Sequence, residues 1–527
     1  IAPELLKAVG LDAKPLRKPL KQVGDKFKSF FEFTPRPLQS ILDEVDPHNF
    51  NTRLLVVESE TGSGKTEAAL NWFRKLFVAG KVDSLYFALP TRVAARELYS
   101  RINNYVSSWF PNSDCRPVTL LAVPGYAQVD GYSVKELLPE GKKANLWQED
   151  QKSLTLERHW AGAMPKRFLA ATIAVGTIDQ ALLSIVQTAH AHLRSVCLDR
   201  SLLVVDEVHA SDLYMSRLLC FLLAHHLGVG GTAMLLSATL GSRALNDYIQ
   251  ITRPEQALSS FSAAVKKPYP ALTFSDGRVA AAGATERPKE VHFETHDWAF
   301  SPENAVDQIL APALRVGARV LVVMNTVARA LAMQRAVEAS DAIDEAWLFK
   351  CRKKICPHHG RFAPADREIL DQAVSARFGK KSPPGPVLLV GTQTLEQSLD
   401  IDCDLLLTDL APCDVLLQRV GRLHRHLRRR PTGYTGARCI VLVPDQPLES
   451  ALGTRGEVSG DFKRLGYGSV YEDLRSLELT YRTIKEYPRV TVPADNRLLV
   501  EKATHPEALN GLIGGYWEEH GNLLHGK

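Results

Sequence analysis

The sequence of 527 residues lacks any run of about twenty uncharged apolar residues, the length that a membrane-spanning helix needs. Its start carries no signal-peptide pattern, and the first residue is Ile1 instead of Met. No internal repeat is found, apart from a shared architecture of two parts of the chain. We therefore expect a cytoplasmic protein with no membrane partner. The Ile1 start also leads us to expect a fragment of a longer chain.

Neither charge nor cysteine dominates the composition. The net charge is only +5 although 23% of the residues are charged, so the balance permits binding to a polyanion without demonstrating it. Basic residues cluster locally, in the segments LRKPLK, CRKK and HRHLRRR. The eight cysteines are scattered, which favours reduced thiols over disulfides. Cys351 and Cys356 precede His358 and His359, but their spacing is wrong for a zinc knuckle.

Short apolar runs alternate with helical patterns in two parts of the chain, as in parallel sheets flanked by helices. The first part contains LLVVES, LYFALP, IAVGT, LLVVDE and MLLSA, and the second contains VLVVMNT, VLLVGTQ, LLLTDL and CIVLVP. We predict an α/β fold with two lobes, each a mostly parallel sheet flanked by helices.

The chain is too long for one hydrophobic core, so we predict a division into segments. These are 1–29, a linker or the remnant of a preceding domain; 30–250, a first lobe that binds ATP; 251–289, a connector with little core of its own; 290–445, a second lobe; and 446–527, the start of an accessory C-terminal region.

The segment TGSGKT follows a predicted buried strand and precedes a helical pattern, which is the context of a phosphate-binding loop. Gly62, Ser63 and Gly64 would let backbone N–H groups close on nucleotide phosphates, and the helix N-terminus adds partial positive charge. Lys65 would reach the β- and γ-phosphates, and the Thr66 hydroxyl would ligate Mg²⁺. ATP and Mg²⁺ are therefore the expected cofactors.

Two acidic residues follow the apolar run LLVV, at the end of a predicted strand where ligands bind in open α/β sheets. We predict that Asp206 holds magnesium, directly or through water, and that Glu207 orients the attacking water. His209 would couple this site to motions of the SAT segment, at Ser237 and Thr239. Paired acids at a strand end can instead be helix N-caps, but the neighbouring motifs favour the catalytic interpretation.

Arg419, Arg422 and Arg425 recur every third residue in QRVGRLHRH, so on a helix they would share one face. We predict that Arg422 and Arg425 act from the second lobe on the transferring phosphoryl group, an effect worth roughly 10³–10⁵ in rate. The arginines that follow, Arg428 to Arg430, are expected to face solvent or nucleic acid.

Further polar residues have the placing of nucleotide and nucleic-acid contacts. Gln39, in FEFTPRPLQ, precedes the phosphate loop at a distance that suits a glutamine reading the adenine edge. Hydroxyl, amide and guanidinium groups at predicted strand ends suit a sugar-phosphate backbone, because such contacts position a strand without reading its sequence. The candidates are Arg92, Thr177, Asn325, Thr326, Thr392 and Gln393.

These motifs, in this order, resemble a superfamily-two DExH helicase core over roughly residues 30–445. Three strings are similar to the CRISPR-associated helicase–nuclease of type I systems: DEVHASDLYMSRLL, HHGRFAPADRE and GTQTLEQSLDIDCDLLLTDLAPCDVLLQRVGRLHRH. The resemblance implies two tandem RecA-like lobes that use ATP and magnesium to move 3′ to 5′ along single-stranded DNA. It also implies recruitment by an RNA-guided type I CRISPR surveillance complex, after which the displaced strand is degraded.

The family's nuclease is a metal-dependent HD domain, and we see no ligand set for it here. The His296-Asp297 dipeptide is interpreted as a surface pair. An HD nuclease domain or subunit outside this sequence is therefore an expected partner. Two other functions stay open, an RNA helicase or remodelling ATPase of the same superfamily and a nucleotide-gated scaffold. A scaffold is disfavoured because it has no need of all the predicted catalytic residues.

Overall fold

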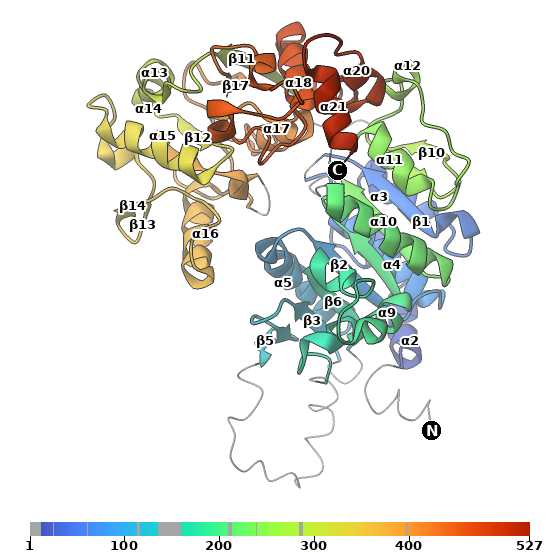
Figure 1. Ribbon diagram of the computed structural model, residues 1–527. Helices are drawn as coiled ribbons and strands as arrows, with labels where there is room; N and C mark the ends of the chain where they lie inside the picture. The colour runs from blue at the N-terminus through green and yellow to red at the C-terminus, as the bar shows by residue number, and fades with distance from the viewer. Residues whose placement is uncertain are drawn as a thin grey trace. The chain divides into compact units, whose positions relative to one another are not determined.

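The computed structural model describes residues 12–24, 26–60, 62–112, 116–134, 160–208, 213–238, 240–283, 288–396 and 399–526 (Figure 1). The chain forms two compact units. Unit 1 comprises Ile1–Leu240, Ala244–Ala257 and Pro268–Ala284, and unit 2 comprises Gly241–Arg243, Leu258–Lys267 and Thr285–Lys527. None of the described helices is long and apolar enough to cross a bilayer.

Unit 1 is built on a ten-stranded sheet in the order β10-β9-β1-β8-β7-β2-β6-β3-β4-β5. The six central strands pair in parallel, and two antiparallel strands extend each side. The strands are β1 (Leu54–Glu58), β2 (Ser84–Leu89), β3 (Thr119–Ala122), β4 (Gln128–Val129), β5 (Tyr132–Ser133), β6 (Ile173–Thr177), β7 (Ser201–Val205), β8 (Thr232–Ser237), β9 (Ala271–Phe274) and β10 (Val279–Ala281).

Helices cover both faces of this sheet. Alternate residues of β1 enter different cores, because successive side chains of a strand point to opposite faces: Leu55 and Val57 join one core, and Leu54 and Val56 the other. The first core contains residues of α2 (Lys14–Val23), α3 (Pro37–Glu44), α4 (Lys65–Val78) and α5 (Arg92–Trp109). The second contains residues of α8 (Ile178–Leu182), α9 (Ala191–Asp199), α10 (Leu213–Gly228) and α11 (Ser242–Ile249).

Unit 2 is built on a six-stranded sheet in the order β15-β12-β16-β17-β11-β18, parallel except for the edge strand β18. The strands are β11 (Lys289–His296), β12 (Arg319–Val323), β15 (Val387–Gly391), β16 (Leu405–Asp409), β17 (Ala437–Leu442) and β18 (Arg489–Val492). A separate hairpin consists of β13 (Lys350–Cys351) and β14 (Lys354–Ile355).

The helices of unit 2 are α12 (Phe261–Ala264), α13 (Pro302–Ala305), α14 (Ala311–Arg315), α15 (Val327–Ala339), α16 (Pro364–Phe378), α17 (Cys413–Val420), α18 (Leu474–Glu486), α19 (Asn496–Thr504), α20 (Pro506–Asn510) and α21 (Trp517–His525). All but α12 and α20 of the unit 2 helices contribute buried residues to two cores. The predicted class, two mostly parallel sheets flanked by helices, is confirmed.

Two segments carry more structure than the sequence led us to expect. Within 251–289, β9 pairs antiparallel with β1, and Leu272 and Phe274 are buried in the core of unit 1. Beyond residue 445, β18 completes the second sheet, and Leu477 and Leu499 lie in a core of unit 2. The segment boundaries drawn from the sequence stay predictions.

Candidate nucleotide-binding site and strand-end loops

The segment predicted to bind phosphate joins β1 (Leu54–Glu58) to α4 (Lys65–Val78), which is the strand–loop–helix context expected from the sequence. Gly62 and Gly64 have φ angles of +87° and +89°, a left-handed conformation that residues with a Cβ rarely adopt. Helix α4 begins at Lys65, with Gly64 as its N-cap. The first N–H groups of the helix therefore face the loop, which is the backbone arrangement that binds phosphate.

Lys65 is buried, with 7% of its surface exposed, and its ammonium folds back onto the loop. Its Nζ donates to the carbonyl oxygens of Ser59 at 2.6 Å and Glu60 at 3.3 Å. The Ser63 hydroxyl is buried and makes no hydrogen bond within the described residues. A buried polar group without a partner costs free energy, and a phosphate oxygen would provide one. These residues therefore fit a nucleotide phosphate.

Gln39 lies against the phosphate loop from α3. It is fully buried, and its Nε2 donates to the Gly64 carbonyl at 3.0 Å while its Oε1 accepts from the backbone N–H of Arg36 at 2.9 Å. The Arg36 guanidinium donates to the Gly62 carbonyl. The structure thus brings Gln39 to the loop, as expected from its spacing, and its role in reading adenine stays a prediction.

The strands that carry the acidic pair and the SAT segment end at the same edge of the sheet as the phosphate loop. Strands β1, β8 and β7 are neighbours and parallel, and Ser59 N–H donates to the carbonyl of Ser237 at 3.0 Å. Asp206 follows β7, and its Oδ1 accepts from the backbone N–H of Glu207 at 2.9 Å. Glu207 has a φ of +56°, uncommon for a residue other than glycine and often found at functional sites. His209 and Thr239 lie outside the described residues.

The arginines of QRVGRLHRH do not share one helical face, so that expectation is wrong. Helix α17 ends at Val420, and the chain then turns through Gly421 and His424, which has a φ of +49°. Arg419, on the helix, is fully buried; its Nε donates to Glu396 at 2.7 Å and its Nη2 to Asn325 at 3.0 Å.

The two predicted catalytic arginines lie beyond the helix and differ in their partners. Arg422 is buried and donates from Nη1 to the Leu399 carbonyl at 2.7 Å and from Nη2 to the Glu396 carbonyl. Arg425 forms an ion pair with Asp400, with 2.7 Å between Nε and Oδ1. The Asp400 side chain is 57% exposed.

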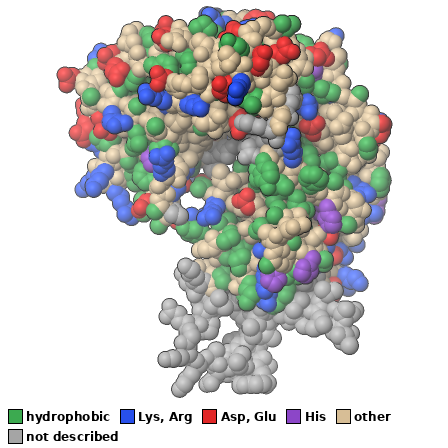
Figure 2. All heavy atoms as spheres, in the orientation of Figure 1, with side chains coloured by type: hydrophobic (Ala, Val, Ile, Leu, Met, Phe, Trp, Pro, Cys, Tyr) green, Lys and Arg blue, Asp and Glu red, His purple; other side chains and the backbone are tan. Residues whose placement is uncertain are grey.

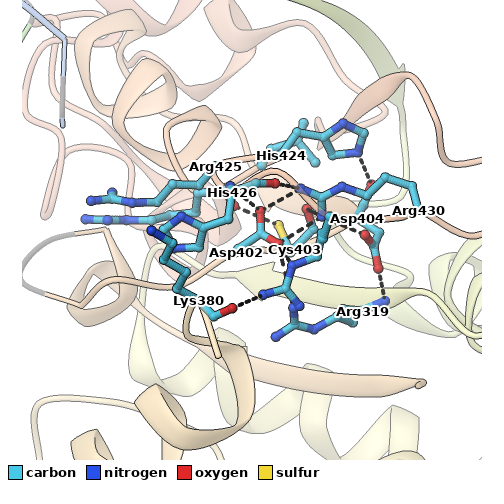
Figure 3. Close-up of polar contacts among 12 residues, drawn as sticks. Arg319, Lys380, Asp402, Cys403, Asp404, His424, Arg425, His426 and Arg430 are labelled. Carbon is cyan, nitrogen blue, oxygen red and sulfur yellow. Dashed lines mark hydrogen bonds and ion pairs between the residues drawn. The ribbon is translucent and has the colours of Figure 1, made fainter. Parts of the chain in front are cut away.

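The arginines that follow do not all face solvent. Arg430 donates to Asp402 through two bonds of 2.9 Å and to Asp404 at 2.7 Å (Figure 3). Arg428 pairs with Asp402 at 2.9 Å, whereas Arg429 is exposed. Because both aspartates are buried, the expectation that Arg428 to Arg430 face solvent or nucleic acid is wrong for the first and last of them.

Lys289 holds the end of α17 from β11. Its Nζ donates to the carbonyls of Val420 and Leu423, both at 2.6 Å. Val420 is the last residue of α17 and Leu423 lies just beyond it, where backbone acceptors lack intrahelical partners. Burial lowers the pKa of Lys289 to about 8.

The predicted nucleic-acid positions lie at strand ends but differ in exposure. Arg92 is exposed at the start of α5, whereas Asn325 is buried and donates to the carbonyls of Leu410 and Leu465. Gln393 donates to the Asn325 carbonyl at 2.6 Å. Thr177 and Thr392 are buried, and Thr326 caps α15. The structure therefore gives Asn325 an internal hydrogen-bonding role, and contact of any of the six with a strand stays a prediction.

One polar cluster at the β15 end was not predicted as a site. His358 is fully buried; its Nε2 bonds Asp371 at 2.7 Å and its Nδ1 bonds Thr394 at 2.8 Å. Burial lowers the pKa of His358, and the Asp371 carboxylate opposes this. The string HHGRFAPADRE marks this region, but its pattern does not show that His358 reaches the loop after β15.

Comparisons of sequence and of structure with known proteins both find similarity to Cas3 proteins. A family model described as the C-terminal part of the CRISPR-associated nuclease/helicase Cas3 matches residues 316–428. The Cas3 endonuclease/helicase of Escherichia coli (strain K12) is 32% identical over 434 residues, covering 78% of this chain and 45% of that protein.

Two solved structures are similar over nearly the whole chain. A crystal structure of T. fusca Cas3 with AMPPNP has a TM-score of 0.72 and 27% identity, covering 95% of this chain and 55% of that one. A chain of a pre-nicking CRISPR RNA-guided surveillance complex has a TM-score of 0.63 and 25% identity, covering 100% of this chain and 55% of its own length. The present chain thus spans about half the length of the relatives that it matches.

Proposed function

The helicase core of this chain belongs to the Cas3 family of CRISPR-associated proteins, and we propose that it is an ATP-dependent single-stranded DNA translocase or helicase. The proposal rests on the residues gathered at the carboxyl-terminal ends of the central parallel strands of unit 1. The loop before α4, with its two glycines of positive φ, and the buried Lys65 follow β1. The Asp206–Glu207 pair follows the parallel strand β7. Parallel strands with this arrangement bind nucleotides at their carboxyl ends.

The residues at this edge have separate tasks in ATP hydrolysis. Lys65 would exchange the carbonyls of Ser59 and Glu60 for phosphate oxygens and so neutralise their charge. The Thr66 hydroxyl and the Asp206 carboxylate would hold magnesium, which supplies further charge neutralisation when bound. Glu207 would orient the attacking water.

The similarity to Cas3 relatives supports a proposal for the substrate and partners. We propose that the chain moves 3′ to 5′ on the DNA strand displaced by a type I CRISPR surveillance complex in the cytoplasm. An HD nuclease domain or subunit outside the present sequence would degrade that strand. The similarity to a chain of a pre-nicking surveillance complex supports this partner class. Backbone contacts suffice for such a motor, because the guide RNA supplies sequence specificity.

The deciding experiment is the steady-state ATPase rate without nucleic acid, with single-stranded DNA and with RNA of matched sequence. We expect stimulation by DNA. Preference for RNA would favour the superfamily-two RNA helicase or remodelling ATPase, and no stimulation by either would contradict a strand-driven motor.

Two variants assign the activity to the site. Lys65→Ala and Glu207→Gln should each lower hydrolysis by at least about 100-fold, since each removes a group that acts on transition-state charge or on the attacking water. Lys81→Ala, an exposed lysine of the same unit, is the matched control. Hydrolysis that survives both site variants would contradict the assignment.

A further inference from the structure

The β13–β14 hairpin of unit 2 is a basic element that the helicase motifs do not explain. It stands apart from the six-stranded sheet as a two-stranded sheet of its own, with Lys350 paired to Ile355 and Cys351 to Lys354. Figure 1 shows it on the side of unit 2 where α16 lies. Its turn consists of Arg352 and Lys353 alone.

The turn places an arginine and a lysine in a left-handed backbone conformation, which asparagine and glycine adopt more readily. Arg352 and Lys353 have φ angles of +49° and +68°. Two-residue hairpin turns with both central residues in this left-handed region strongly favour Asn-Gly, since side chains with a Cβ are strained there. An arginine and a lysine at these positions therefore cost conformational stability. What they add is positive charge at the hairpin tip.

Within the described residues, no carboxylate forms an ion pair with the charges at the hairpin tip. Arg352, Lys353, Lys354 and Arg361 are all exposed, and none forms an ion pair with a carboxylate in the described part of the chain. Lys350, at the base of the hairpin, does pair with Glu345 at 2.8 Å. Figure 2 shows Lys and Arg side chains gathered on the side of unit 2 where Figure 1 places the hairpin.

The hairpin is tied to the loop that follows β15. The chain leaving β14 reaches His358, whose N–H donates to the Val390 carbonyl at 2.8 Å and whose carbonyl accepts from Thr392 N–H at 3.0 Å. The His358 ring adds bonds to Asp371 and Thr394. The basic tip is thus linked, over a few residues, to the strand end where Thr392 and Gln393 are expected to contact nucleic acid.

We propose that the β13–β14 hairpin is a second contact for the phosphate backbone of the single strand held by the loop after β15. This rests on the proposed function, because it takes the same strand as its ligand. Unpaired, exposed lysine and arginine side chains bind phosphates without reading bases, which suits a motor that must act on any sequence. The hairpin would extend the site along the strand beyond the helicase motifs.

The turn allows a variant that removes charge without harming the fold. Arg352→Asn with Lys353→Gly installs the pair that this turn favours, so its thermal unfolding temperature should equal or exceed that of the wild type. The matched control is Lys380→Gln with Lys381→Gln. It removes two exposed lysines from the same unit, in the loop before β15, at the opposite end of that strand.

Binding is measured by fluorescence anisotropy on a long oligothymidylate, over a series of salt concentrations. The hairpin variant should bind several-fold more weakly at low salt, and the slope of log affinity against log salt should fall by about 0.7 for each lost phosphate contact. Basal ATP hydrolysis without DNA should not change. The control should keep the wild-type affinity and slope.

The outcomes separate this proposal from the proposed function. If the wild type binds the oligonucleotide and the hairpin variant matches it in affinity and slope, the hairpin proposal is overturned while the motor stands. That result would point to an acidic protein surface as the partner of the hairpin. If the wild type binds no DNA, the proposed function fails, and the hairpin proposal fails with it.

Discussion

The arginines Arg419, Arg422 and Arg425 differ in how firmly their guanidinium groups are held. Arg419 is fully buried among side-chain partners, and Arg422 donates to two carbonyls of its own unit. Arg425 pairs with the exposed Asp400, and its Nη1 has no hydrogen-bond partner within the described residues. Because the carboxylate of this ion pair is exposed, and exposed ion pairs contribute only about 0–1 kcal/mol, we expect Arg425 to exchange its partner for a phosphate at lower cost than Arg419 or Arg422.

We therefore expect Arg425→Ala to lower the ATP hydrolysis rate by roughly 10³-fold or more, with little loss of stability. Arg422→Ala should instead lower the free energy of unfolding by about 1–3 kcal/mol, because it leaves two buried carbonyls without donors. Steady-state ATPase assays and urea unfolding separate the two effects. Full hydrolysis by Arg425→Ala would exclude a role for it at the phosphate.

At the residue scale, the sequence predicts positions better than partners. The place of Gly62, Gly64 and Lys65 between a strand and a helix follows from local context, because this loop is contiguous in sequence, and their binding of phosphate stays a prediction. Arg430 was misassigned because its partners, Asp402 and Asp404, lie 28 and 26 residues earlier. From the sequence alone, a run of basic residues is expected to be exposed to solvent. Only the three-dimensional structure shows that buried carboxylates pair with these arginines.

At the scale of elements, the carbonyl groups at and just after the C-terminal end of helix α17 are hydrogen-bonded by Lys289, a lysine of strand β11. Lys289 has a pKa of about 8, against an ordinary value of 10.5, because it is buried. Between these values the unfolded chain binds more protons than the folded chain. The contribution of Lys289 to the free energy of unfolding is therefore lowest below pH 8 and rises toward pH 10.5.

We expect the difference in unfolding free energy between the wild type and Lys289→Met to shift in favour of the wild type between pH 8 and 10. The steepest slope is about 1.4 kcal/mol per pH unit. Urea unfolding at several pH values provides the measurement, with the exposed Lys381→Met as control. Parallel curves for wild type and Lys289→Met would contradict the assigned coupling.

The segment after α17 is held in place by ion pairs between Arg430 and the buried carboxylates of Asp402 and Asp404. Removing Arg430 would leave buried carboxylates without their main partner, so Arg430→Ala should cost about 3–5 kcal/mol in unfolding free energy. Its exposed neighbour is the control: Arg429→Ala should change stability by less than about 0.5 kcal/mol. Urea midpoints of the two variants test this, and equal midpoints would show that Arg430 contributes no more than a surface residue.

Element prediction succeeded where strands are apolar and central, and it was incomplete at the sheet edges. LLVVES and LLVVDE, at β1 and β7, are continuous apolar runs, as buried parallel strands are. β9 and β10 are short and lie among Ala, Ser and Pro, so their pattern resembles a connector. β9 pairs with β1, a long-range contact that no local pattern encodes, and β10 pairs in turn with β9.

At the scale of the whole molecule, the nucleotide should stabilise one unit directly. A non-hydrolysable ATP analogue with magnesium, at a hundred times its Kd, should add about 2.7 kcal/mol to the stability of unit 1. Hydrogen exchange followed by mass spectrometry should show slower exchange in β1 and α4. Lys65→Ala should lose this protection, and protection retained in that variant would place the nucleotide elsewhere.

The pairing of β1 also has a consequence for synthesis on the ribosome. Leu54 of β1 pairs with Ala233, and Leu55 pairs with Phe274, so both partners emerge long after β1 itself. At roughly 5–20 residues per second, the second partner follows about 10–45 s later. Both edges of this apolar strand stay open until β8 emerges, and one edge stays open until β9 follows, which is an aggregation hazard. Slower translation between β1 and β9 should therefore lower the yield of folded protein unless a chaperone shields the nascent strand.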